Sequence, residues 1–159
     1  MSEDKRDNAD NPGVITPPPL IYAGALAAGL LANRRFRFSF LPRRIARTLG
    51  PLLAIGGFTV GLLGFREMRL AETNVDTYKP ATAVVTEGPY RFTRNPMYVG
   101  FTLMYVGISA LANALVPILL LPAVFAVMRR GVIEREERYL ERKFGDEYLE
   151  YKERVRRWI

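Results

Sequence analysis

The stretch that decides the fold is GPYRFTRNPMYVG, residues 88–100, which runs directly into a long uncharged segment. That segment, MYVGFTLMYVGISALANALVPILLLPAVFAV, residues 97–127, holds no Asp, Glu, Lys or Arg. About 20 apolar residues cross the hydrocarbon core of a bilayer, so the segment is long enough to span a membrane. A turn that carries two arginines is therefore placed where the chain enters the membrane, which favours chemistry on a lipid-like substrate.

The uncharged segment is too long for one upright helix. At 1.5 Å per residue it would extend for about 46 Å, whereas the hydrocarbon core is about 30 Å thick. Ala112-Asn113 and Pro117 lie near its middle and favour a tight turn. We therefore expect a helical hairpin of two short antiparallel spans, residues 96–112 and 115–128.

Two more uncharged segments, residues 11–33 and 48–65, precede the hairpin. They predict a span over Leu20–Asn33, introduced by a run of three prolines, and a second span over Leu49–Phe65. In the second span Gly57, Gly61 and Gly64 follow one another at three- and four-residue spacing, which predicts a smooth face for close helix packing.

The sequence thus predicts an all-α integral membrane protein with about four transmembrane helices and a charged, amphipathic helical tail. We expect one domain over residues 17–159, after an acidic, disordered leader at residues 1–16. Cysteine and histidine are absent from the chain, which excludes disulfides, thiolate nucleophiles and imidazole acid–base catalysis. The net charge of +7, carried by arginines beside apolar spans, favours contact with membrane lipids over binding of nucleic acid.

Six arginines in residues 34–47 create a conflict in topology. The positive-inside rule prefers this segment in the cytoplasm. Three spans satisfy the rule better there, but they place residues 88–100 and Glu136-Glu137 on opposite faces of the membrane. Four spans keep these two polar features on one face, so we expect four.

The tail, residues 129–159, repeats apolar residues at helical spacing. Ile133, Leu140 and Phe144 form an apolar stripe, and Glu137 falls on that stripe. A carboxylate in such a position needs a cationic or hydrogen-bond-donating partner. Glu137 and its neighbour Glu136 are therefore candidate functional residues.

The turn at residues 88–100 allows two interpretations. Asn95 is expected to cap the helix that begins at Pro96, whose free N–H groups favour an anionic ligand. Arg91 and Arg94 add positive charge nearby. An ordinary capped helix entry, with arginines bound to lipid headgroups, accounts for the same residues.

Two patterns in this half of the chain resemble a known family. Gly88-Pro89-Tyr90, followed by Arg94-Asn95-Pro96-Met97-Tyr98-Val99-Gly100, is similar to the signature of isoprenylcysteine carboxyl methyltransferases and related phospholipid methyltransferases. The family's tail pattern follows in order as Glu136-Glu137, Leu140, Phe144-Gly145, Tyr148, Tyr151 and Val155. The resemblance covers roughly residues 70–159 and is nearest to a short bacterial integral-membrane branch. Arg156 stands where the family has proline, which leaves the path of the last residues open.

The resemblance implies an S-adenosylmethionine-dependent methyltransferase whose lipid substrate enters from the bilayer. Carried over by position, the cofactor-binding residues are Gly88, Tyr90, Arg94, Asn95, Pro96, Tyr98, Gly100, Glu136 and Glu137, with no metal. The expected catalytic residues are Arg94, Arg135 and Glu137, and the expected substrate-binding residues are Arg91, Tyr148 and Tyr151. Many relatives have histidine at the position of Asn95, so that contact is weaker here or serves another role.

Methyl transfer to a carboxylate suits a chain without histidine or cysteine, because the nucleophile is already ionised and needs positioning and desolvation more than a base. We therefore expect carboxyl O-methylation of an isoprenoid-linked or other lipid acid, at the cytoplasmic face of a bacterial inner membrane. Two alternatives stay open: an NADPH-dependent enzyme resembling sterol reductases, which share a similar turn, and a non-enzymatic protein that binds anionic lipids.

Overall fold

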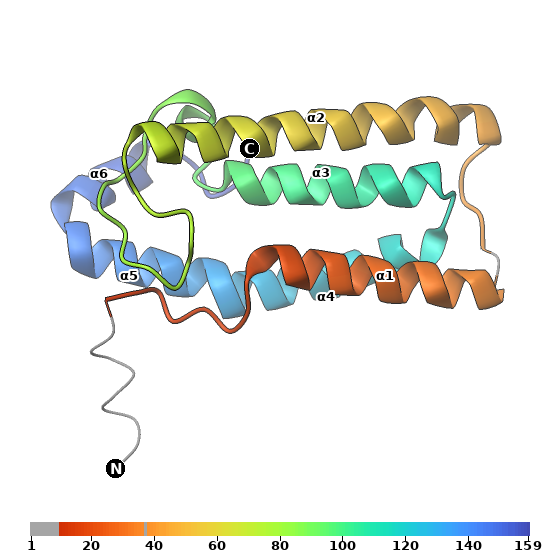
Figure 1. Ribbon diagram of the computed structural model, residues 1–159, viewed down its shortest axis with the longest axis horizontal. Helices are drawn as coiled ribbons and strands as arrows, with labels where there is room; N and C mark the ends of the chain where they lie inside the picture. The colour runs from red at the N-terminus through yellow and green to blue at the C-terminus, as the bar shows by residue number, and fades with distance from the viewer. Residues whose placement is uncertain (1–9, 37) are drawn as a thin grey trace, which may run out of the picture.

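Four helices run side by side along the long axis of the molecule (Figure 1). The structure, a computed structural model, describes residues 10–36 and 38–159, and in these ranges it contains helices and no strand. The bundle consists of α1 (Pro18–Phe36), α2 (Arg43–Leu70), α3 (Pro96–Leu111) and α4 (Leu115–Met128). The all-α prediction and the hairpin with its turn before residue 115 are confirmed. Both upstream helices are longer than expected, because their polar ends are also helical.

Helices α2 and α3 pack closely because glycines remove side chains from their contact. A Cβ added to Gly57 would lie 2.6 Å from the carbonyl oxygen of Gly100, and one added to Gly107 would lie 2.4 Å from the nitrogen of Ala54. Gly61 contributes its backbone, since a Cβ on Gly100 would meet its nitrogen at 2.8 Å. The predicted smooth glycine face is confirmed.

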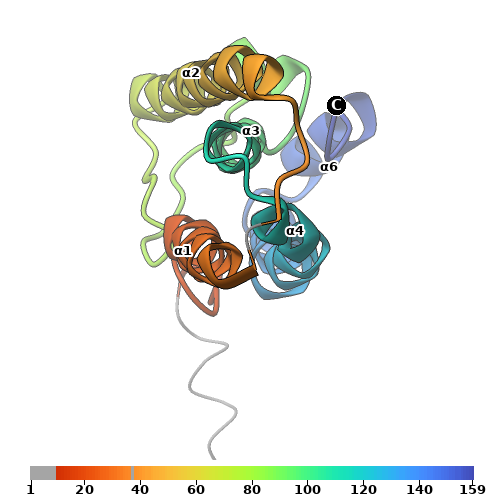
Figure 2. The same ribbon diagram turned by 90° about the vertical axis from the view of Figure 1, so that its right-hand side faces the viewer.

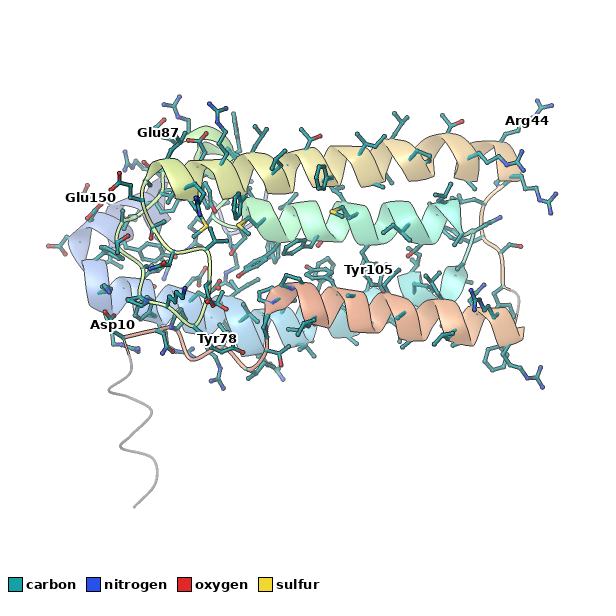
Figure 3. The ribbon with its side chains drawn as sticks, viewed as in Figure 1. Asp10, Arg44, Tyr78, Glu87, Tyr105 and Glu150 are labelled. Carbon is teal, nitrogen blue, oxygen red and sulfur yellow. The ribbon has the colours of Figure 1, made fainter. Side chains whose placement is uncertain are left out.

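Tyrosines fill the space between α1, α3 and α4. Figure 2 shows α3 lying between α2 on one side and the α1–α4 pair on the other. Tyr105 points from α3 into this interior (Figure 3), and its hydroxyl donates to the carbonyl oxygen of Pro117 at 2.8 Å. Tyr22 of α1 packs beside it and hydrogen-bonds with Thr102 at 2.9 Å. The core thus joins the helical hairpin to α1.

The outer surface of the bundle is apolar. Leu52, Ile55, Phe58 and Leu62 of α2 are each more than half exposed. Such a contiguous apolar face is rare on a water-soluble monomer and is typical of a membrane-facing surface. Two helices, α2 and the continuous helix Leu115–Phe144, are long and apolar enough to cross a membrane, and α3 is a shorter apolar helix. The lengths of these helices and the apolar outer surface together indicate a membrane protein.

Helix α4 continues into the charged tail without a break. A π-helical segment, η2 (Arg129–Ile133), leads into α5 (Glu134–Phe144). Gly145 adopts a positive φ of 54° and ends α5, after which α6 (Asp146–Arg154) begins. A π-helical turn often marks a functional site, and here it ends three residues before Glu136.

Residues 10–17 form a strap that lies against η2 and α5. The predicted disordered leader covers residues 1–16; residues 1–9 lie outside the described part of the chain, and the described remainder is packed rather than loose. Val14 is buried in the core, the nitrogen of Ile15 donates to the carbonyl oxygen of Gly131 at 3.2 Å, and Asp10 pairs with Lys143 at 2.7 Å. The apolar and backbone groups of these described residues find partners on the tail helix.

Candidate active site

Two adjoining cavities lie at the end of the bundle where α3 begins and α5 passes. Their volumes are about 330 and 110 Å³. The larger one falls within the range of roughly 300–1,000 Å³ typical of small-molecule sites. The two cavities share the side chains Met68, Ala81, Tyr90, Arg94, Asn95, Glu136 and Leu140. They therefore form one continuous candidate site between the predicted turn and the tail helix.

The turn before α3 is held by its backbone and by α6. It begins with a short 3-10 helix, η1 (Gly88–Arg91), in which Gly88 has a φ of 59°. A Cβ at Gly88 would lie 2.7 Å from Cγ of Glu67, so this position requires glycine on two counts. The hydroxyl of Tyr151 donates to the carbonyl oxygen of Tyr90 at 2.8 Å, which ties the turn to α6.

Asn95 anchors the C-terminal segment instead of capping α3. It occupies the N-cap position, but its side chain makes no capping hydrogen bond. Its Nδ2 donates to the carbonyl oxygen of Arg157 at 3.0 Å, and Oγ1 of Thr93 donates to the same oxygen at 3.0 Å. The capping prediction was wrong, and the path of the last residues is now defined: they return to the turn, where the nitrogen of Arg94 donates to the carbonyl oxygen of Arg156.

Glu137 lies between two guanidinium groups. Its Oε1 is 3.0 Å from Nη1 of Arg94, and its two oxygens accept hydrogen bonds of 3.0 and 2.7 Å from Arg157. The side chains of Glu137 and Arg94 are both 9% exposed. The expectation that Glu137 needs a cationic partner is confirmed.

Arg94 retains hydrogen-bonding capacity that the protein does not use. Within the described chain, its Nε and Nη1 are buried and lack a hydrogen-bond partner; Nη1 is close to Glu137 but not aligned with it for a hydrogen bond. A buried donor without a partner costs about 1–3 kcal/mol. Arg94 lines both cavities, so its guanidinium is a candidate partner for a ligand carboxylate or another acceptor placed there.

Glu136 presents the opposite charge to the same space. The hydroxyl of Tyr98 donates to both of its carboxylate oxygens, at 2.7 and 2.8 Å. Glu136 lies beyond Met128, where the apolar part of the helix ends, and it lines both cavities. Burial raises the pKa of Glu136 to about 7, and neighbouring Glu137 acts in the same direction, against the Tyr98 hydrogen bond. The protonated form of Glu136 is therefore favoured more strongly than that of an exposed glutamate.

Three tyrosines complete the smaller cavity. Tyr90, Tyr148 and Tyr151 pack as one buried cluster, with the rings of the last two 6.1 Å apart. Burial, followed by the nearby charge of Glu137, raises the pKa of Tyr148 to about 12, and burial also raises the pKa of the other two phenols. All three phenols are neutral at physiological pH and can donate hydrogen bonds.

The structure brings together most, but not all, of the residues expected from the sequence. Those that line the two cavities are Tyr90, Arg94, Asn95, Pro96, Tyr98, Glu136, Glu137, Tyr148 and Tyr151. Four others lie elsewhere. Gly88 and Gly100 are backbone contact points with α2, exposed Arg91 pairs with Glu87, and exposed Arg135 donates to the carbonyl oxygen of Gly13.

Several wall residues were missed from the sequence. Met68 comes from the end of α2, and the connector between α2 and η1 contributes Thr73, Ala81, Val84 and Val85. The strap contributes Pro12 and Pro17, next to Pro18 and Pro19 at the start of α1. Arg157, the second partner of Glu137, had no spacing signal because the C-terminal segment is not helical there.

Comparison with known proteins places the chain among methyltransferase-related sequences. The family described as phospholipid methyltransferase matches residues 45–147, which is more than half of the chain. The chain is 32% identical over 110 residues to a cobalt-zinc-cadmium resistance protein of Cupriavidus metallidurans, covering 67% of this chain and 49% of that protein. It is 38% identical over 72 residues to protein-S-isoprenylcysteine O-methyltransferase of Schizosaccharomyces pombe, covering 45% and 30%.

A third relative is protein-S-isoprenylcysteine O-methyltransferase B of Arabidopsis thaliana, 41% identical over 76 residues, which cover 45% of this chain and 36% of that protein. The chain thus spans about half or less of the length of these curated relatives. No solved structure matches it.

Proposed function

The chain belongs to the phospholipid methyltransferase family, and on that basis we propose that it transfers a methyl group from S-adenosylmethionine to a lipid-like acceptor. The observation that carries this proposal is the pairing of opposite charges in one cavity. The guanidinium of Arg94, two nitrogens of which lack a hydrogen-bond partner, and the carboxylate of Glu136 line the same space. A ligand that carries both a carboxylate and an ammonium group, as an amino acid does, complements them.

The residues present fit the cofactor's amino-acid portion. Arg94 would hold its carboxylate through the donors that the protein leaves unpaired. Glu136 would hold its ammonium group or its ribose hydroxyls, with Tyr98 fixing the carboxylate. When bound, the cofactor supplies an electrophilic methyl group on a sulfonium. Glu137 positions Arg94 rather than contacting solvent.

The acceptor side of the site is apolar. Met97 and Phe101 of α3 line the larger cavity together with Pro17, Pro18 and Pro19. Such walls suit the hydrocarbon part of a lipid acid that arrives from the bilayer. An ionised carboxylate needs orientation and exclusion of water to attack a methyl group, and it needs no base. We therefore favour carboxyl O-methylation, with an isoprenoid-linked acid as the preferred acceptor class.

The same proposal includes four spans, α1 to α4, with the site at the cytoplasmic face of a bacterial inner membrane. Arg34 and Arg35 at the end of α1 and Arg43, Arg44 and Arg47 at the start of α2 lie at one end of the bundle (Figure 1). All other lysines and arginines of the described chain lie towards the opposite end, where the site is. The positive-inside rule, applied to the whole chain, therefore favours the site end in the cytoplasm.

The test is binding followed by turnover, using the full chain in detergent. We expect S-adenosylhomocysteine to bind and NADPH not to bind, and we expect labelled methyl groups to enter a base-labile ester when a lipid extract is added. Arg94→Gln should abolish both S-adenosylhomocysteine binding and methyl transfer. Arg138 is an exposed arginine of α5 outside the cavities, so Arg138→Gln should retain both. Binding of NADPH alone would indicate a reductase, and binding of neither would indicate a lipid-binding protein. A base-stable product would move the acceptor from a carboxylate to nitrogen or carbon.

A further inference from the structure

A second cavity, larger than the candidate active site, lies at the opposite end of the bundle. Its volume is about 870 Å³. It is formed where the end of α1, the start of α2 and the turn between α3 and α4 meet. The polar side chains that line it are Asn33, Arg34, Ser39, Arg43, Arg47 and Asn113. The proposed methyl transfer uses none of them.

This cavity has a fixed wall. Asn113, in a left-handed conformation with a φ of 48°, accepts hydrogen bonds from the nitrogens of Phe40 and Leu41 at 3.1 and 3.0 Å. Its Nδ2 donates to the carbonyl oxygen of Leu41 at 2.8 Å, and the nitrogen of Leu115 donates to the carbonyl oxygen of Phe38. The segment before α2 is thus pinned to the α3–α4 turn, and the cavity is preformed.

The charge of this cavity is not balanced by the protein. Arg34, Arg43 and Arg47 line it, while residues 11–66 and 88–133 contain no Asp or Glu. The parts of α1, α2, α3 and α4 that reach this end of the bundle lie within those two ranges. These three arginines are exposed, and an anion from outside that lies among them would lower the repulsion between their charges.

The surroundings of the cavity indicate that this anion is part of a lipid. Leu30, Phe38 and Leu111 line the same space as the arginines. The rings of Phe36 and Phe38 stack 5.9 Å apart and are more than half exposed. Helix α2, with 28 residues, is about 42 Å long and exceeds a hydrocarbon core of about 30 Å. The arginines at its start are therefore at headgroup depth when its other end is at the opposite surface.

We propose that this cavity binds the phosphate headgroup of an anionic phospholipid, in the membrane leaflet opposite the candidate active site. The guanidinium groups would hold the phosphate oxygens, and the apolar wall would contact the glycerol backbone and the first methylenes of the acyl chains. This proposal does not depend on the methyltransferase activity.

The experiment is native mass spectrometry of the full chain in detergent, titrated with dioleoyl phosphatidylglycerol or dioleoyl phosphatidylcholine. The test variant is Arg43→Gln/Arg47→Gln. The matched control, Arg35→Gln/Arg44→Gln, removes the same charge from the end of α1 and the start of α2, at two residues that do not line the cavity; Arg44 projects outward from α2 (Figure 3). We expect one tightly bound phosphatidylglycerol in the wild type, about tenfold weaker binding in the test variant and less than about twofold change in the control.

Equal weakening in both double variants would overturn the proposal in favour of diffuse surface charge. Equal binding of phosphatidylcholine would also overturn it, as would displacement of the lipid by inorganic phosphate, which would identify a free-anion site. Binding of S-adenosylhomocysteine or an unchanged melting temperature shows that a variant is folded. Arg34 lines the same cavity from α1. If the double variant does not fold, Arg34→Gln is tested in its place, with Arg35→Gln as the control.

Discussion

The carboxylate of Glu137 lies 3.0 Å from the guanidinium of Arg94, and both side chains are 9% exposed. The pair joins α5 to the turn before α3, two elements separated along the chain by the whole helical hairpin. Because the hairpin brings them together, the site forms only when α3 and α4 are packed correctly. The pair also holds the guanidinium that we propose to receive a ligand carboxylate.

Replacing Glu137 by glutamine should be strongly destabilising. The substitution leaves the buried guanidinium of Arg94 without a counter-charge, and breaking a buried pair in this way costs about 3–5 kcal/mol. Arg157→Gln should cost far less, roughly 1 kcal/mol, because Arg157 is 28% exposed and Arg94 keeps its partner. Thermal unfolding of both variants in the same detergent measures the difference. Equal losses of stability in the two variants, or an unchanged stability of Glu137→Gln, would show that the Glu137–Arg94 pair is not important for folding.

The glycine contact between α2 and α3 gives a second prediction with an adjacent control. Gly57→Ala would place a Cβ 2.6 Å from the carbonyl oxygen of Gly100, which forces the helices apart, at a cost of about 1–3 kcal/mol. At Gly56 an added Cβ meets nothing within 4 Å, so Gly56→Ala should leave stability unchanged or slightly raised. The melting temperature and the S-adenosylhomocysteine affinity of each variant check these expectations. Similar melting temperatures of the two variants would show that α2 and α3 are not in close contact at Gly57.

The sequence predicted the helices well because their signals are local. Uncharged segments and helix-breaking residues mark α1 to α4, and the turn at Asn113 follows from residue type. Glu137 could also be identified, since a carboxylate on an apolar stripe is unusual. In contrast, the role of Asn95 was misassigned: the acceptor for its amide is the carbonyl oxygen of Arg157, which no short-range pattern reveals.

Some residues that reach the site could not be predicted from the sequence for the same reason. Arg157 and Pro12 reach the site from the two ends of the described chain through long-range packing. Predicting such contacts requires knowing where the ends return, and their sequences carry no periodic signal. Arg91 and Arg135 were predicted as site residues only because they are close in sequence to residues that line the cavities.

The C-terminal anchor yields a third prediction. Thr93 and Asn95 both donate to the carbonyl oxygen of Arg157, so Asn95→Ala alone removes one of two hydrogen bonds and should cost about 1 kcal/mol. The double variant Thr93→Val/Asn95→Ala leaves the carbonyl without either donor and should lose more than the sum of the single changes. Thr59→Val, which removes a hydroxyl hydrogen bond on an exposed face of α2, is the control.

The measurements for this anchor are the melting temperature and the affinity for S-adenosylhomocysteine. Release of the C-terminal segment should weaken ligand affinity in the double variant more than in either single variant, because Arg157 then no longer supports Glu137. Full affinity in a double variant whose segment has become sensitive to protease would show that the anchor does not support the site.

Glu136 provides a prediction about pH. Its pKa in the folded protein, about 7, lies above the ordinary value of 4.5, so the folded state binds more protons than the unfolded state between these values. In the absence of ligand, this group therefore lowers stability as the pH rises from about 4.5 to about 7, and the loss persists above pH 7. Glu136→Gln should thus raise the melting temperature at about pH 8 and have little effect at about pH 4.5.

Ligand binding should depend on pH in the opposite direction. If the carboxylate of Glu136 contacts a cationic or hydroxyl group of the cofactor, affinity for S-adenosylhomocysteine should rise about tenfold between about pH 6 and pH 8, as the group ionises. Glu136→Gln should bind weakly and without this dependence. Glu141→Gln, a glutamate of α5 that lines neither cavity, should keep the wild-type profile. A wild-type affinity that does not change over this range, or a Glu136→Gln variant that binds normally, would remove Glu136 from the cofactor site.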